Sequence, residues 1–177
     1  MARQKSTALD MIRSLAVIGI AVAFMFALSL QDRADRSMPQ VDVTATVEAA
    51  RKNVDYPVLT VPTLPSGWRA NAAYFEPVRG FDGRWVFHVG YVTPAEYYFG
   101  IDASNQPDIE SFVSGYLYGV DTGQTRTVAG LTFKVYKNEK QQVWLHRGVA
   151  DVPYAIVLTG AGNPDDFETF TRMLTAG

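Results

Sequence analysis

The two histidines, His88 and His146, are the side chains of this sequence that could meet across a sheet and bind a metal. There is no cysteine, which excludes disulfides, thiolate metal ligands and cysteine nucleophiles. A zinc site needs three or four ligands, and no carboxylate can be placed beside the histidines from the sequence. The pattern therefore favours two half-exposed strand histidines, and we expect no metal and no cofactor.

The remaining candidates for catalysis lack the motifs that reaction chemistry requires. Ser66 lies in "LPSGW", which is not a Gly-x-Ser-x-Gly nucleophile elbow. Residues 159–166, "TGAGNPDD", lack the glycine spacing of a dinucleotide site and the Gly-Lys-Ser/Thr of a P-loop. Asp165 and Asp166 are better explained as first-turn residues that stabilise a helix dipole, and their charge repels phosphate. We predict no catalytic residue and a protein that is not an enzyme.

A group of tyrosines is the best candidate for ligand binding. Their rings could line a groove for a sugar or for a small apolar ligand, although aromatic side chains also fill ordinary cores and interfaces. Both interpretations remain open at this point. The candidate ligand-binding residues are Tyr91, Tyr97, Tyr98, Tyr116 and Tyr118.

The charge of the chain argues against a nucleic-acid partner. Its formal net charge is −2, and lysine and arginine form no cluster along the sequence. A nucleic-acid-binding surface needs cations that neutralise phosphates. We therefore expect no nucleic acid among the partners.

An apolar run near the amino end indicates membrane insertion. Ser29 is the one polar residue within residues 15–30, and with Met11 and Ile12 the helix would extend about 30 Å, enough to cross a bilayer. Basic residues precede the run, so the N-terminus is expected inside and the large domain outside. A cleaved signal peptide has the same polarity, but its small-residue site would fall within the run. A retained signal-anchor in the cytoplasmic membrane is the favoured interpretation.

These observations predict four parts of the chain. Residues 1–10 form a cytoplasmic tail and residues 11–30 a single transmembrane helix that contacts the lipid bilayer. Residues 31–55 form a linker in which a short helix could occur. Residues 56–177 form the extracytoplasmic domain.

The pattern of residues after position 56 predicts an α+β fold. Strand-like runs rich in valine and aromatic residues occupy residues 68–76, 84–92, 97–103, 124–138, 141–149 and 152–160. Helical stripes occupy residues 105–119 and 163–177, and Asn163 with Pro164 marks the start of the second helix. We expect one antiparallel sheet with these two helices packed on one face.

The two halves of the domain resemble each other. Each contains three strands and then a helix that begins at an Asn/Pro/Asp sequence, and residues 88–90 align with residues 146–148. A tandem strand–strand–strand–helix repeat explains this pattern, because repeated units share a core. Similarity through composition alone explains it as well, and the predicted architecture is the same in both cases.

The order of several short motifs resembles the DUF4245 family of actinobacterial membrane-anchored proteins of unknown function. The motifs are "DMIRSLAV", "YPVLTVPTLPSGWRAN", "VGYVTPAEYY" and "LTGAGNPDDFETFTRML", and they cover nearly the whole chain. The second half also loosely resembles DUF4367-type domains. The resemblance implies an extracytoplasmic α+β domain and brings no catalytic residues with it.

The functional hypothesis that follows is a non-catalytic interaction module that docks onto an envelope or membrane-protein complex. The alternative is a carrier or sensor that binds a small apolar or glycan ligand in an aromatic-lined groove. The alternative predicts a cavity of a few hundred Å³ lined by the tyrosines.

Overall fold

The computed structural model describes residues 12–13, 15–22, 24–25, 41–117, 119–148 and 153–177. The chain divides into two units, Met1–Met38 and Pro39–Gly177. In the first unit the described residues are helical, and their large apolar side chains are exposed. No helix within the described ranges combines the length and the hydropathy that crossing a membrane requires. The second unit is called the main domain below.

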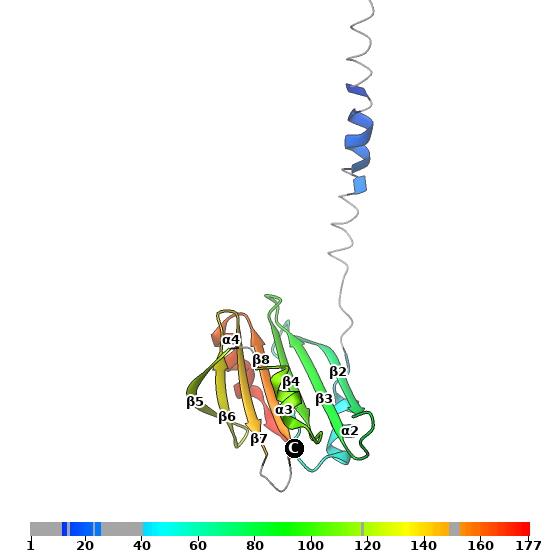
Figure 1. Ribbon diagram of the computed structural model, residues 1–177. Helices are drawn as coiled ribbons and strands as arrows, with labels where there is room; N and C mark the ends of the chain where they lie inside the picture. Colours follow the sequence, from blue (N-terminus) through cyan, green and yellow to red (C-terminus); the bar gives the residue numbers. More distant parts are fainter. Residues whose placement is uncertain (1–11, 14, 23, 26–40, 118, 149–152) are drawn as a thin grey trace, which may run out of the picture. The chain divides into compact units, whose positions relative to one another are not determined.

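The main domain is built on a seven-stranded antiparallel sheet with the spatial order β2-β3-β4-β8-β7-β6-β5 (Figure 1). Within this sheet, every described strand pair but one joins strands that are neighbours in the sequence, and the exception is the central pair of β4 with β8. The strands are β2 Arg69–Pro77, β3 Trp85–Val92, β4 Tyr98–Ser104, β5 Val120–Val128, β6 Leu131–Lys137, β7 Gln141–Arg147 and β8 Ala155–Ala161.

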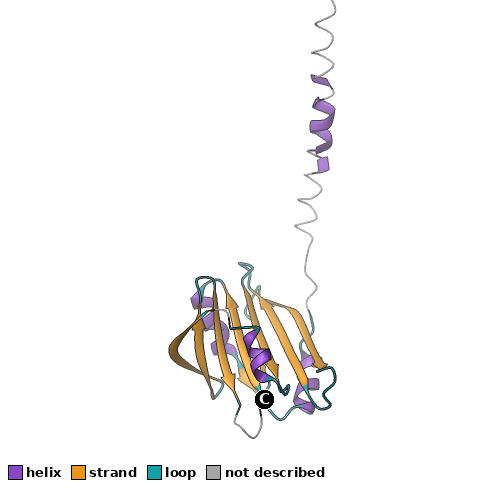
Figure 2. Ribbon diagram, viewed as in Figure 1, coloured by secondary structure: helices purple, strands orange, loops and turns teal. Residues whose placement is uncertain are grey.

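Helices cover both faces of this sheet (Figure 2). One face carries α2 (Thr44–Asn53), α4 (Pro164–Met173) and the short ribbon of β1 (Leu59–Thr60) with β9 (Thr175–Ala176). The other face carries α3 (Ile109–Ser114). We call these the α4 face and the α3 face.

Strand alternation explains why the two faces hold separate cores. Trp144 of β7 packs in the cluster that contains Phe167 and Phe170 of α4. Its neighbours Val143 and Leu145 pack with α3 on the opposite face, because successive strand residues point to opposite sides. The expected α+β class and antiparallel sheet are therefore confirmed.

The pair of helices that share a face differs from the expected pair. Residues 109–114 and 164–173 were predicted to lie on one face, but α3 lies opposite α4, and α2 is the helix that accompanies α4. The physical reason is that β7 and β8 are apolar on both faces, so both faces need a cover. Glu110 of α3 also accepts two hydrogen bonds from the Arg147 guanidinium at the end of β7.

The strand order fits two meanders that meet at β4 and β8, but the side-chain register does not match the predicted repeat. His88 projects from the α3 face, where it bonds Asp102, whereas the His146 ring contacts Phe133 in the α4-face core. A rotation that exchanged the two meanders would keep both histidines on one face. Residues 88–90 and 146–148 are therefore not structurally equivalent.

The short helix considered within residues 31–55 is present as α2, and it belongs to the folded domain. Val47 and Ala50 are buried in the α4-face core. Asp42 Oδ1 accepts a hydrogen bond of 2.9 Å from the backbone N–H of Thr44 at the start of the helix. Part of the expected linker over residues 31–55 is therefore a helix that packs on the α4-face core.

Local signals set the limits of several other elements. Asn163 Oδ1 accepts a hydrogen bond of 3.1 Å from Asp165 N, and Pro164 is the first helical residue, as predicted for α4. The predicted run over residues 124–138 is two strands, because Ala129 and Gly130 adopt positive φ values of 50° and 82° and turn the chain. The predicted helix over residues 105–119 is limited to α3.

Candidate functional site

A chain of hydrogen bonds centred on Asp102 lies on the α3 face. His88 Nδ1 is 2.7 Å from Asp102 Oδ1, and the Tyr116 hydroxyl donates to the same oxygen over 2.9 Å. The Tyr98 hydroxyl lies 3.0 Å from His88 Nε2. Two phenols, an imidazole and a carboxylate thus form one connected network, which we call the Asp102 network.

The register of the β3–β4 hairpin produces this network. His88 and Asp102 are directly opposed, so their side chains stand next to each other on the same face. Gly90 opposes Gly100 two positions further along. A Cβ at Gly90 would lie 2.6 Å from Tyr98 Oη. The absence of a side chain at this glycine is therefore what lets Tyr98 reach along the sheet to His88.

Burial raises the pKa values of the two phenols in the network. Asp102 is only 3% exposed, and its Oδ1 accepts from the Tyr116 hydroxyl and pairs with His88 Nδ1. His88 Nε2 pairs with the Tyr98 hydroxyl. Burial, together with the charge of Asp102, raises the pKa of Tyr98 to about 12 and raises the pKa of Tyr116 as well. Both phenols therefore remain protonated donors, and a raised pKa is the opposite of what an activated nucleophile needs.

Two further side chains border the network. The Tyr74 ring stacks on His88 with 4.8 Å between ring centroids and an interplanar angle of 23°. Asn71 Oδ1 is buried and accepts no hydrogen bond from any residue that the structure describes. That oxygen lies close to Gly90, 2.7 Å from where a Cβ would stand.

A pocket of about 280 Å³ adjoins the network, and Tyr98 and Tyr116 form part of its wall. It lies where β4 and β7 begin and β8 ends, beside the end of α3. None of the described residues that line it is charged. We call it the α3 pocket, and its other lining residues are Gly115, Gln141, Gln142, Val143, Thr159, Gly160 and Ala161.

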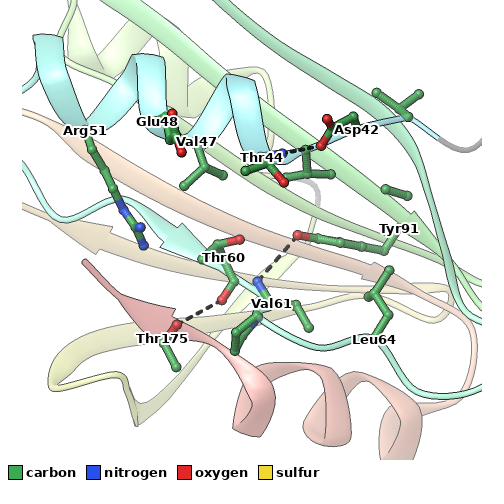
Figure 3. Close-up of a pocket in the computed structure, with 14 residues that line it drawn as sticks. Asp42, Thr44, Val47, Glu48, Arg51, Thr60, Val61, Leu64, Tyr91 and Thr175 are labelled. Carbon is green, nitrogen blue, oxygen red and sulfur yellow. Dashed lines mark hydrogen bonds between the residues drawn. The ribbon is translucent and has the colours of Figure 1, made fainter.

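A larger cleft of about 780 Å³ lies on the α4 face between α2 and the β1–β9 ribbon (Figure 3). Tyr91 forms part of its floor, is 1% exposed, and accepts from the Val61 N–H at 3.5 Å. Figure 3 shows the Arg51 side chain extending from α2 toward the ribbon. We call it the α2 cleft, lined by Val41, Asp42, Val43, Thr44, Val47, Glu48, Arg51, Thr60, Val61, Pro62, Leu64, Ala70, Tyr91 and Thr175.

The five predicted tyrosines do not share one groove. Tyr98 and Tyr116 come together at the α3 pocket, whereas Tyr91 lies on the opposite face in the α2 cleft. Tyr97 is 36% exposed in the turn between β3 and β4, and a Cβ at Gly162 would overlap its ring. Tyr118 lies outside the described residues.

Sequence reasoning missed Asp102 as the partner of His88. The signal was present, because His88 alternates with the buried Phe87 and Val89, and Asp102 alternates with Ile101 and Ala103. The two polar residues therefore had to share a face of the predicted hairpin. His146 stands apart from this network and contacts Tyr154 and the Thr132 carbonyl. Within the ranges that the structure describes, no group of three or more histidine and acidic residues could hold a metal ion.

Comparisons with known proteins give a family but no activity. No curated protein sequence matches this chain. Among solved structures, the crystal structure of MucB in complex with MucA(peri) is similar with a TM-score of 0.37 and 11% identity. The match covers 67% of this chain and 36% of the MucB chain, so this protein aligns with about a third of that chain's length. The family model for DUF4245, "Protein of unknown function", matches residues 3–174, and the chain belongs to that family.

Proposed function

We propose that this protein is a membrane-anchored extracytoplasmic interaction module that works without catalysis and docks onto an envelope or membrane-protein complex. The observation that carries the proposal is the α2 cleft of about 780 Å³, which combines an apolar floor with a charged rim. Protein interfaces have this composition, with an apolar centre and a polar border.

The floor and the rim of the cleft have different roles. Val41, Val43 and Leu64 are partly exposed in the cleft and present apolar surface that inserted side chains of a partner would cover. Burial of such surface contributes about 25 cal/mol for each Å² removed from water. Glu48 and Arg51 on α2 place both signs of charge at the rim, which selects the partner and its orientation.

The apolar amino-terminal segment supports placement at a membrane. Residues 11–30 are almost entirely apolar and follow a basic tail. Ten residues, 31–40, separate this segment from Val41 at the edge of the α2 cleft. A cleft so close in sequence to an inserted segment would meet partners that are themselves in or near the membrane. The large exposed apolar side chains of the segment are Ile12, Leu15, Val17, Ile18, Ile20, Val22, Phe24 and Met25.

Docking is tested by affinity purification of the tagged full chain from membranes in mild detergent. We expect a stoichiometric membrane-protein partner that is lost when Glu48→Lys and Arg51→Glu are combined. The matched control reverses two exposed charges in the β6–β7 turn, Glu139→Lys with Lys140→Glu, and should keep the partner. Retention of the partner by the α2 variant, or absence of a stoichiometric partner from the unchanged chain, would reject docking through the α2 cleft.

Topology is tested separately with single cysteines, because the chain has none of its own. A membrane-impermeant maleimide applied to intact cells should label Thr125→Cys, on the exposed edge strand β5. Ser6→Cys should react only after the cells are permeabilised. The reverse pattern would contradict the proposed orientation.

A further inference from the structure

We propose that the α3 pocket binds a small, uncharged polyhydroxylated ligand with the size of one sugar ring. This site is independent of docking through the α2 cleft, because it lies on the opposite face of the sheet. The evidence is the geometry of the pocket floor, the chemistry of its walls and the fixed orientation of two tyrosines.

Three adjacent strands form the floor of the pocket. Tyr98, Ala161 and Gln141 are directly aligned across β4, β8 and β7. In the next row on the same face, Thr159 stands between Gly100 and Val143. A Cβ at Gly100 would lie 2.6 Å from Thr159 Oγ1, so the bare glycine leaves room for that hydroxyl.

The walls carry uncharged groups that both donate and accept hydrogen bonds. Gln141 contributes a side-chain amide, and Thr159 contributes a hydroxyl. Both side chains share the α3 face with Val143, and no hydrogen bond joins either of them to another residue in the described part of the chain. Free amides and hydroxyls in a pocket without charge match a neutral ligand with several hydroxyl groups.

The Tyr98 and Tyr116 rings complement the polar groups. A pyranose ring has polar edges and an apolar face of C–H groups, and aromatic rings offer large apolar faces with negative potential. The phenol oxygens are engaged by His88 and Asp102, which leaves the rings of both tyrosines to line the pocket. His88 and Asp102 are therefore positioning residues that fix the rings before a ligand arrives, which reduces the entropy lost on binding.

The size of the pocket limits the ligand. Its volume of about 280 Å³ lies just below the usual range of small-molecule sites, about 300–1,000 Å³. One sugar ring is favoured over a long glycan or a lipid chain. The absence of charge from the lining disfavours uronic acids and amino sugars with a free amine.

The test uses the full chain in lipid nanodiscs, because glycoside detergents would compete for the site. Glucose, galactose and N-acetylglucosamine are titrated and followed by saturation-transfer NMR, with glucuronate and glucosamine as charged counterparts. We expect saturable binding of at least one neutral sugar, and weaker binding of its charged counterpart. Gln141→Ala should weaken binding about tenfold, which corresponds to about 1.4 kcal/mol. The matched control Gln124→Ala, on β5, should leave it unchanged.

Tyr116→Phe provides a second variant that keeps the ring and removes the hydrogen bond to Asp102. It should weaken sugar binding while a thermal melt still shows a cooperative transition. Binding of none of the neutral sugars, preference for a charged sugar, or equal binding by Gln141→Ala and the unchanged chain would each overturn the proposal. Saturable binding of a short uncharged peptide in place of a sugar would overturn it too.

Discussion

His88 and Asp102 face each other directly across β3 and β4, with 2.7 Å between Nδ1 and Oδ1. Asp102 is almost wholly buried, so this pair and the two phenols attached to it form a buried polar network on the α3 face of the sheet. The Asp102–His88 pair resembles the Asp–His pair of a catalytic relay, but the Tyr98 hydroxyl already pairs with the second ring nitrogen of His88, Nε2. The arrangement fits a structural and positioning role.

Removal of the central carboxylate should destabilise the fold. Asp102→Ala leaves the His88 Nδ1–H and the Tyr116 hydroxyl without their acceptor. We expect the free energy of unfolding to fall by about 2–4 kcal/mol. Urea denaturation followed by the fluorescence of the three tryptophans measures the change. Glu139→Ala at an exposed position is the control, expected within about 0.5 kcal/mol, and equal stabilities for the two variants would contradict a structural role for the network.

The buried tyrosines should make the domain sensitive to alkali. The pKa of Tyr98 is raised from 10.0 to about 12 by burial and by the charge of Asp102, and the pKa of Tyr116 is raised for the same reasons. The phenol of Tyr98 ionises at a lower pH in the unfolded chain than in the folded one. The stability that comes from keeping this phenol protonated in the fold is therefore complete below pH 10. It is lost as the pH rises toward 12. Urea midpoints measured across this range should decline less steeply for Tyr98→Phe, and an unchanged slope would show that Tyr98 ionises freely.

A methyl group at Gly160 should disturb the packing of α4. A Cβ there would overlap the ring of Phe167, which is buried in the α4-face core. Overpacking of this kind costs about 1–3 kcal/mol. Gly115→Ala is the control, because Gly115 has an ordinary helical φ of −65° and its nearest Cβ contact would be 3.4 Å. Thermal melts of the two variants should separate clearly, and coincident melts would mean that α4 can shift without cost.

The position of α2 predicts where a minimal folded fragment begins. Residues 39–177 contain α2, whereas residues 56–177 lack Val47 and Ala50 and expose the core beneath them. We expect the longer fragment to unfold cooperatively in urea, and the shorter one to be markedly less stable or unfolded. Comparable unfolding midpoints would show that α2 contributes little to the fold.

Local signals allowed the elements of the main domain to be predicted. The side-chain cap of Asn163, Pro164 and the buried aromatic stripe specify α4 without reference to the rest of the chain. The β3–β4 hairpin follows from alternation on both strands. These features depend on residues close in sequence, and they agree with the structure.

Which helices pack on the same face of the sheet could not be predicted in the same way. An apolar helix stripe shows that a helix is buried, but not against which side of a sheet. Consecutive apolar residues in β7 and β8, such as Val143-Trp144-Leu145, indicated that both sides need a cover. The Asp102 network required the register of β3 with β4 as well, and Tyr98 reaches His88 only because Gly90 has no side chain.

The β4–β8 pair has a consequence for how the chain reaches its native state. Each meander assembles from strands adjacent in sequence. The central β4–β8 pair, which we call the seam, instead joins Ser104 to Ala155, and α3 and three strands lie between them in the sequence. Long-range pairing is slow, because a large loop must close before any contact compensates for the lost entropy. Until the seam forms, β4 and β8 present unpaired backbone that another chain could capture. Synthesis of the second meander therefore governs whether the nascent polypeptide matures or self-associates.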